Sequence, residues 1–246
     1  MRLAGKKAIV TGANRSIGRA IAIAFAREGA DVLISYRSDK EGATKTVQAI
    51  KAHGVLGKAV YADFSHGEAV EQFFKSSLEF LGSIDILVNN AAGYNTTEFL
   101  ELAACDFEEL LKVGVTAPML LTQLAAKQMI KQKIAGRIIN ISSISGNRPY
   151  PKRVAHSTAK AALNMLTKAM ALELAMYNIR VNAIAPGETP YESDENGAKT
   201  VPSHIPLRRV GLPEDQALAA VFLASDESSW MTGEVLTIDG GQSLSF

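Results

Sequence analysis

The stretch KAIVTGANRSIGRAIAIAFA, residues 7–26, decides the fold. Residues 7–11 form an apolar run typical of a buried strand, and they lead directly into a turn bounded by Gly12 and Gly18. A segment of helical period follows at residues 17–28. The first N–H groups of that helix, at the positive end of its dipole, would face any phosphate bound at the turn. The stretch therefore predicts a strand, a phosphate-binding turn and a helix.

The same alternation of apolar runs and helical segments continues along the chain. Further candidate strands lie at residues 32–36, 58–62, 84–89, 137–142, 180–185 and 235–238. Amphipathic segments long enough for crossover helices lie at residues 67–81, 106–132, 154–176 and 213–223. This pattern predicts an α/β fold: a single Rossmann-type, doubly wound, seven-stranded parallel sheet with helices on both faces. We expect one dinucleotide-binding domain over residues 1–246, with a polar substrate loop at about 186–204.

Composition excludes several classes of function. The 246 residues carry a formal net charge of +1, from 26 Lys and Arg against 25 Asp and Glu, which disfavours nucleic-acid and membrane-surface roles. Cys105 is the only cysteine, so we expect no disulfide and no metal site built from several thiolates. No segment reaches the ~18 apolar residues that a membrane span needs. We expect a cytoplasmic protein with no metal and no membrane partner.

Five motifs in a fixed order identify a family. They are the glycine turn at 11–18, Asn-Asn-Ala-Ala-Gly at 89–93, Ser-Ser at 142–143, Lys160, and Pro-Gly at 186–187. Each motif falls at a strand end or in the following helix. In this set the chain resembles the short-chain dehydrogenase/reductase family over essentially its whole length. Its ending, Leu-Ala-Ser-Asp at 223–226 and Asp-Gly-Gly at 239–241, resembles the 3-oxoacyl-acyl-carrier-protein reductases in particular.

The resemblance implies a set of cofactor-binding positions. Gly12 permits the tight turn, and Gly18 lets the helix pack close to the strand, whereas Ser16 stands where the family usually has glycine. Asp63 matches the position that hydrogen-bonds the adenine amino group, with a helix N-cap as its alternative role. Asn89 matches the residue that ties neighbouring strands near the cofactor. The predicted set is Gly12, Asn14, Arg15, Ser16, Ile17, Gly18, Arg37, Asp63, Asn89, Ala91, Lys160, Pro186, Gly187 and Thr189.

The residues after the second strand predict the choice of cofactor. NAD-preferring relatives place an acid there to accept the ribose hydroxyls, but this chain has Tyr-Arg-Ser at 36–38 and no acid before Asp39. Arg37 and Arg15 offer planar guanidinium groups that suit a 2′-phosphate. We therefore expect NADP(H). The alternative is that both arginines are ordinary solvated surface residues.

The resemblance also implies a catalytic site, and the sequence departs from it at two positions. The family uses a serine, a tyrosine, a lysine four residues after the tyrosine, and an asparagine in the preceding helix. Ser143 and Lys160 match the serine and the lysine, and residues i and i+4 share one helix face. His156 stands in place of the tyrosine, and Gly114 in place of the asparagine. The predicted catalytic residues are thus Ser143, His156 and Lys160.

Three interpretations of His156 remain open from the sequence. It is a working general acid or base, because imidazole titrates near neutral pH; or a remnant in a chain that binds cofactor without turnover; or a substitution introduced into the chain. Tyr94 and Tyr191 are the alternative sources of the missing phenol. The acidic residues of the substrate loop would disfavour anionic substrates if they face inward. These residues are Glu188, Glu192, Asp194 and Glu195.

The sequence therefore predicts an NADP(H)-dependent oxidoreductase acting on a carbonyl/alcohol pair, with altered or weakened acid/base chemistry. The alternative function is a non-catalytic NADP-binding sensor or the inert partner of an active subunit. We also expect a homotetramer, since family members pair the helices that match 106–132 and 154–176, and apolar residues cover both here. These residues are Leu110, Leu111, Leu120, Leu121, Leu163, Leu166 and Met170.

Overall fold

The strands form one parallel sheet. The computed structural model describes residues 1–190 and 203–244. In sheet order the strands are β3 (Gly57–Tyr61), β2 (Asp31–Tyr36), β1 (Lys7–Val10), β4 (Ile86–Asn89), β5 (Arg137–Ile141), β6 (Arg180–Pro186) and β7 (Val235–Ile238). Every neighbouring pair is parallel. The sheet winds in both directions from β1, which confirms the predicted doubly wound sheet of seven strands.

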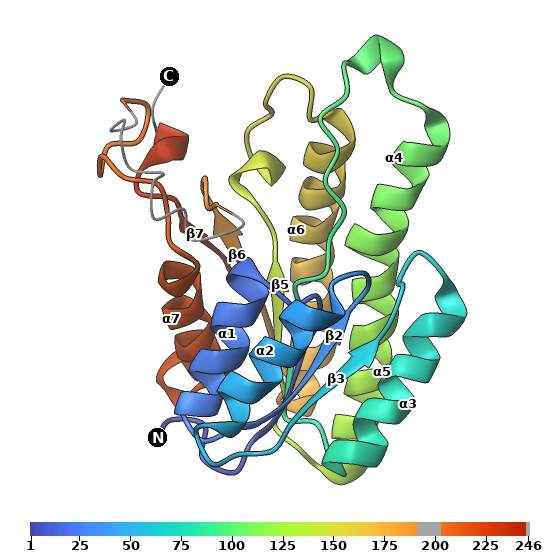
Figure 1. Cartoon of the computed structure of the whole chain (residues 1–246), viewed down its shortest axis with the longest axis vertical. Helices are drawn as coiled ribbons and strands as arrows, with labels where there is room; N and C mark the ends of the chain where they lie inside the picture. The colour runs from blue at the N-terminus through green and yellow to red at the C-terminus, as the bar shows by residue number, and fades with distance from the viewer. Residues whose placement is uncertain (191–202, 245–246) are drawn as a thin grey trace.

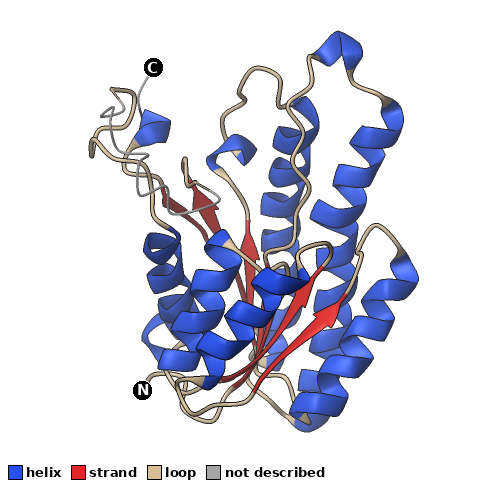
Figure 2. Cartoon of the chain, viewed as in Figure 1, coloured by secondary structure: helices blue, strands red, loops and turns tan. Residues whose placement is uncertain are grey.

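Helices cover both faces of the sheet (Figure 1, Figure 2). On one face lie α1 (Ser16–Arg27), α2 (Lys40–Lys51) and α7 (Pro213–Ala224); on the other lie α3 (Gly67–Leu81), α4 (Ala104–Leu111), α5 (Ala117–Gln132) and α6 (Val154–Leu174). Each layer buries its own apolar cluster against the sheet. The carboxyl ends of all the strands therefore meet at one edge, where the helices that follow them begin.

The long helix predicted at residues 106–132 is interrupted. A π-helical segment, η2 (Lys112–Thr116), separates α4 from α5, and the amide of Ala117 bonds back to the carbonyl of Lys112. Pro118, near the start of α5, has no N–H to offer the carbonyl of Gly114 four residues earlier. The backbone widens by one residue to pass this point, and such π-bulges are frequent at functional sites.

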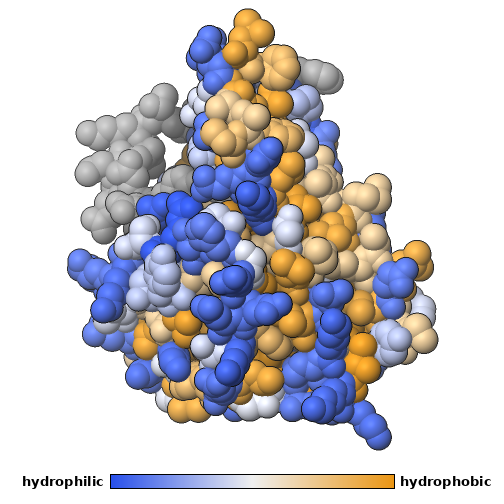
Figure 3. All heavy atoms as spheres, turned by 90° about the vertical axis from the view of Figure 1, so that its right-hand side faces the viewer, coloured by the Kyte–Doolittle hydropathy of each residue, from blue (hydrophilic) through white to orange (hydrophobic). Residues whose placement is uncertain are grey.

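The face formed by α3, α4 and α5 ends in an apolar tip. Figure 3 shows hydrophobic side chains on this face and at the top of the molecule, where Figure 1 places the short 3-10 helix η1 (Phe99–Glu101). Phe99 and Leu100 are 69% and 91% exposed there. No helix within the described parts of the chain is long and apolar enough to cross a membrane.

Only the two ends of the predicted substrate loop belong to the described residues. Pro186 is the last residue of β6 rather than the first of the loop, because its carbonyl side still pairs with β7 at Ile238. Tyr191, Glu192, Asp194 and Glu195 lie outside the described residues. The described part of the loop after β6 consists of residues 187–190 and 203–204.

Candidate active site

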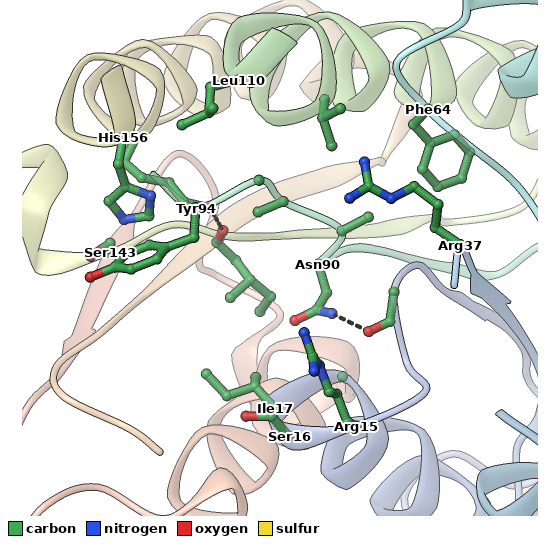
Figure 4. A pocket seen from close by; sticks show the side chains of 18 of the residues that line it. Arg15, Ser16, Ile17, Arg37, Phe64, Asn90, Tyr94, Leu110, Ser143 and His156 are labelled. Atoms are coloured by element: carbon green, nitrogen blue, oxygen red, sulfur yellow. Dashed lines mark hydrogen bonds between the residues drawn. The ribbon is translucent and has the colours of Figure 1, made fainter. Parts of the chain in front are cut away.

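A cavity of about 840 Å³ opens at the carboxyl ends of the strands. Its walls come from the turns after β1, β2, β3, β4, β5 and β6, from α4 and from the first part of α6 (Figure 4). The lining includes most of the predicted cofactor set: Gly12, Asn14, Arg15, Ser16, Ile17, Gly18, Arg37, Asp63, Ala91, Lys160, Pro186, Gly187 and Thr189. It also includes Ser143 and His156. The structure thus brings the two predicted sites into one space.

The glycine turn has the backbone that its sequence requires. Gly12 has φ +62°, and a Cβ there would lie 2.9 Å from the Cα of Ala91. Gly18 has no room for a Cβ either, because the carbonyl oxygen of Gly12 would lie 2.7 Å away. Ser16 has φ +48°, a left-handed conformation that favours glycine, and its hydroxyl donates to the carbonyl of Pro190 at 3.2 Å. Serine in place of glycine at position 16 thus retains the turn and adds a contact to the start of the substrate loop.

The start of α1 fits a pyrophosphate. Its N-cap residue, Arg15, makes no side-chain capping hydrogen bond, and the first turn of the helix contains no acidic residue. The first N–H groups of α1 therefore have no cap from this residue, and the helix dipole adds positive potential. Gly12 and Gly18 both line the cavity at this point. The residues present fit the dinucleotide that the sequence predicts.

Two asparagines at the end of β4 connect it to neighbouring strands. The amide of Asn89 donates to Asn140 Oδ1 on β5 at 2.9 Å, which matches its predicted role, although Asn89 lies beneath the cavity rather than in its lining. Asn90 donates through Nδ2 to the carbonyl oxygens of Thr11 and Gly12, at 2.8 and 3.0 Å. Sequence reasoning did not single out Asn90. Its only signal was its place beside Asn89 in the motif.

Arg15 and Arg37 enter the cavity from two sides (Figure 4). Arg37 follows β2, and its guanidinium lies 3.5 Å from the carboxylate of Glu109, with both side chains 55% exposed. Asp39, the first acid after β2, instead caps α2 by accepting from the amide of Gly42 at 2.7 Å. An acid positioned for ribose hydroxyls is therefore absent from the end of β2, whose residues are all described.

Asp63 is held by the turn that follows β3. Its carboxylate accepts from the amide and the hydroxyl of Ser65, at 3.0 and 2.8 Å. Burial raises the pKa of Asp63, but these hydrogen bonds together lower it by more than burial raises it. The pKa of Asp63 therefore lies below the ordinary value. His66, not Asp63, is the N-cap of α3. The N-cap alternative is therefore wrong, and Asp63 lines the cavity as a charged carboxylate.

Ser143 and Lys160 occupy the floor of the cavity. Ser142 turns its hydroxyl toward α6, where it donates to Asn164 Oδ1 at 2.5 Å, whereas Ser143 Oγ accepts from the amide of Ser145 at 3.0 Å. Ser143 thereby keeps its own proton for a ligand. Lys160 is buried on α6 and donates from Nζ to the carbonyl of Ile141 at 2.7 Å. Burial lowers the pKa of Lys160 to about 8.

His156 lies one helical turn before Lys160 and enters the same space (Figure 4). Burial lowers the pKa of His156 to about 4, and the positive charges of Lys160 and Arg153 lower it as well. A hydrogen bond with the backbone of Gly93 acts in the opposite direction and is outweighed. The Tyr94 ring stands edge-on to the imidazole, with 5.2 Å between centroids. At neutral pH His156 is therefore a neutral imidazole.

Gly114 lies in the π-helical segment, across from α6. It is buried, and a Cβ at this position would lie 3.4 Å from the Cβ of Ala159, an ordinary van der Waals contact. The backbone therefore has room for a side chain that the sequence omits. Within the described residues, no group of three or more His, Cys, Asp or Glu side chains is arranged to hold a metal ion.

Comparisons with known proteins agree with this geometry. The family described as Enoyl-(Acyl carrier protein) reductase matches residues 12–243. Glucose 1-dehydrogenase 2 of Bacillus subtilis is 39% identical over 249 residues, covering 98% of this chain and 96% of its own. The 3-oxoacyl-(acyl-carrier-protein) reductase of Aquifex aeolicus is 39% identical over 245 residues, covering 98% of each chain.

A solved structure gives the same result. Acetoin dehydrogenase from Enterobacter cloacae superposes with a TM-score of 0.94 at 35% identity, covering 98% of this chain and 97% of that one. The chain belongs to the short-chain dehydrogenase/reductase family of oxidoreductases. The resemblance predicted from the five motifs is confirmed.

Proposed function

We propose that this protein is an NADP(H)-dependent oxidoreductase acting on a carbonyl/alcohol pair. The observation that carries the proposal is the single cavity that joins the glycine turn and two arginines to Ser143, His156 and Lys160. Members of this family use nicotinamide cofactors, and their names describe dehydrogenases and reductases. The choice of NADP(H) over NAD(H) rests on Arg15, Arg37 and the capping role of Asp39.

The chain's own residues would hold the cofactor along the cavity. The start of α1 would receive the pyrophosphate, Asp63 the adenine amino group, and Arg37 with Arg15 the 2′-phosphate. Lys160 is fixed by its bond to Ile141 and remains mostly protonated below pH 8, so it would bind the ribose near the nicotinamide. When bound, the reduced nicotinamide delivers hydride to a carbonyl carbon while the oxygen takes up a proton, giving an alcohol and oxidised nicotinamide.

Ser143 and His156 would handle the substrate oxygen. The Ser143 hydroxyl has its Oγ fixed by Ser145 and its proton free to donate. The neutral imidazole of His156 would accept the hydroxyl proton of an alcohol, or return one to a carbonyl oxygen after taking it from solvent. Imidazole is shorter than phenol, so we expect a bridging water or a shifted substrate. Loss of the family tyrosine and asparagine should make turnover of simple ketones slow.

Cofactor preference tests the first half of this proposal. Arg37→Asp should weaken binding of NADPH far more than binding of NADH, because it replaces the cation near the 2′-phosphate with an anion. Isothermal titration calorimetry with both nucleotides measures the change. Lys75→Glu, on the exposed side of α3, makes the same change of net charge away from the cavity and serves as control. Equal affinity of the unaltered protein for NADH and NADPH would refute the proposed cofactor choice.

The alternative function is a non-catalytic NADP-binding sensor or an inert partner subunit. The pair of absent groups, the phenol and the amide, is the observation that favours it. Steady-state assays with a panel of ketones and alcohols distinguish the two functions. NADPH binding without turnover of any of them would favour the sensor.

A further inference from the structure

We infer that the substrate carries an anionic group, a carboxylate or a phosphate, near its reacting carbonyl, and that Arg153 binds this group. The inference rests on the proposed function and specifies the substrate class for the same site. Three cations of the cavity lining already have proposed roles: Arg15, Arg37 and Lys160. Arg153 also lines the cavity, and it is not among the residues proposed to bind the cofactor.

Aromatic side chains hold Arg153 in place. Its guanidinium carbon lies 5.5 Å from the ring centroid of Tyr94 and 5.5 Å from that of Tyr150. Contacts of this kind place the cation over the face of an aromatic ring and hold it there by cation–π attraction. The N–H fork at its edge remains available for a planar anion. A long, flexible side chain is thus ordered in advance, which reduces the entropy lost when a ligand binds.

The described carboxylates of the cavity are engaged with other groups. Glu109 lies beside Arg37, and Asp63 accepts from Ser65. Glu188 is one of the loop acids that the sequence analysis expected to disfavour anionic substrates. Its carboxylate lies 3.0 Å from Nε2 of His204. Asp106 accepts only a weak bond, from the thiol of Cys105. Within the described residues Arg153 has no carboxylate within 4.0 Å, so its charge is not neutralised by this part of the chain.

Arg153 is also electrostatically close to the reacting groups. Its charge is one of the causes that lower the pKa of His156. An anion bound to Arg153 would offset that charge and favour the protonated imidazole. An anionic substrate would therefore help to supply the proton that carbonyl reduction consumes. Tyr94, which contacts both Arg153 and His156, connects the anion-binding group to the site of reaction.

Matched substrate pairs test the inference. Acetoacetate has a charged carboxylate where methyl acetoacetate has a neutral methyl ester, and dihydroxyacetone phosphate and dihydroxyacetone differ only in the phosphate. The unaltered protein with NADPH should show a higher kcat/KM for an anionic member, and the pair that shows it identifies the anion. Arg153→Gln should reduce that preference by about 10- to 100-fold, the range for a hydrogen bond to a charged group. Arg153→Lys keeps the positive charge but loses the N–H fork, so its preference for the anionic substrate should lie between those of the unaltered protein and Arg153→Gln.

Arg148→Gln is the matched control. Arg148 lies 6.0 Å from the same Tyr150 ring but does not line the cavity, so its removal should leave the substrate preference unchanged. Arg153 makes no side-chain capping bond at the start of α6, so its replacement removes no helix cap. An equal preference in the unaltered protein and in Arg153→Gln, for both pairs, would overturn the inference.

A binding measurement separates this inference from the proposed function. Malonate, titrated by calorimetry into the protein with NADP⁺, should bind to the unaltered protein and to Arg148→Gln but not to Arg153→Gln. Malonate binding that depends on Arg153, with no turnover of any substrate, would support the anion site and contradict the oxidoreductase. The opposite outcome is that the protein turns over the neutral ester, while Arg153→Gln changes neither malonate binding nor substrate preference. This outcome would support the oxidoreductase and contradict the anion site.

Discussion

At the scale of single residues, the surroundings of His156 determine which proton it can hold. The imidazole is largely buried, and both Lys160 and Arg153 oppose its protonation, so its pKa lies near 4. Between pH 5 and 8 it is neutral, whereas Lys160, with a pKa of about 8, is mostly charged. Histidine ordinarily titrates near pH 6.5, but in this site neither His156 nor Lys160 does. Among the interpretations of His156, this geometry favours a base.

Two substitutions would introduce the tyrosine and the asparagine that the family resemblance implies. His156→Tyr together with Gly114→Asn should raise kcat with simple ketones, by at most the ~10²- to 10⁴-fold typical of an acid/base catalyst. The 3.4 Å contact between a Cβ at Gly114 and the Cβ of Ala159 is an ordinary one, so the backbone accepts the first atom of the new side chain without a clash. If His156 instead serves one particular substrate, the same double change should abolish activity on that substrate. Steady-state kinetics with both kinds of substrate measure these effects, and calorimetry with NADPH confirms that cofactor binding is intact.

Sequence reasoning identified most cavity residues but not their partners. Ser143, His156 and Lys160 follow from motif order and from the i, i+4 spacing, which fixes a helix face. Glu109 and Arg153 have no such signal, because they reach the cavity from α4 and from the start of α6 only after the chain has folded. The direction in which Lys160 shifts the pKa of His156 also follows from the i, i+4 spacing. The size of the shift could not be predicted, because burial is its largest cause and is not visible in the sequence.

At the scale of elements, periodicity predicted the strands to within a few residues, but it missed the break at η2. Apolar spacing continues through residues 106–132, and the interruption depends on the proline of α5 and on the backbone bond from Ala117 to Lys112. The polar helix α2 was not among the named segments, since only Gly42, Ala43, Thr46 and Ile50 are buried on it. A helix with so small a buried face gives a weak hydrophobic pattern.

The end of α5 provides a stability prediction. Lys133, its C-cap residue, has φ 55° and ψ 39°, the left-handed conformation in which glycine is preferred. Lys133→Gly should stabilise the protein by ~1 kcal/mol, because it relieves the steric cost of this conformation. Lys131→Gly, two residues earlier in the last turn of α5, should destabilise it by ~1 kcal/mol. Urea unfolding measures both changes, and destabilisation by Lys133→Gly would contradict the account of this helix end.

At the scale of the whole molecule, only some of the residues that suggested the predicted homotetramer are free to contact another subunit. Leu110, Leu121 and Leu163 are only 8%, 1% and 1% exposed, because they pack within the monomer. The most exposed apolar residues of α6 are Met165 and Leu172, at 65% and 81% exposed. Periodicity reveals an apolar face but not which neighbour covers it. The tetramer stays a prediction, now assigned to these two side chains.

Light scattering tests that assembly. The unaltered protein should have a tetrameric mass at micromolar concentration, and Met165→Lys with Leu172→Lys should produce a smaller species, since burial of an unpaired lysine at an interface is costly. Leu56→Lys, which changes a leucine 54% exposed between α2 and β3, is the control and should leave the mass unchanged. A monomeric mass for the unaltered protein would contradict the prediction.

The pH profile of kcat/KM for the unaltered protein and for His156→Ala tests the central claim most directly. We expect kcat/KM with NADP⁺ and an alcohol substrate to be level between about pH 5 and 7, to fall below pH 5 as free-enzyme His156 takes up a proton and can no longer accept one from the alcohol, and to fall above pH 8 as Lys160 loses its proton. His156→Ala should lower kcat/KM by about 10²- to 10⁴-fold. Rapid turnover of ordinary alcohols and ketones, with a pH profile that His156→Ala leaves unchanged, would contradict the account and point to Tyr94 or Tyr191 as the group that exchanges the proton.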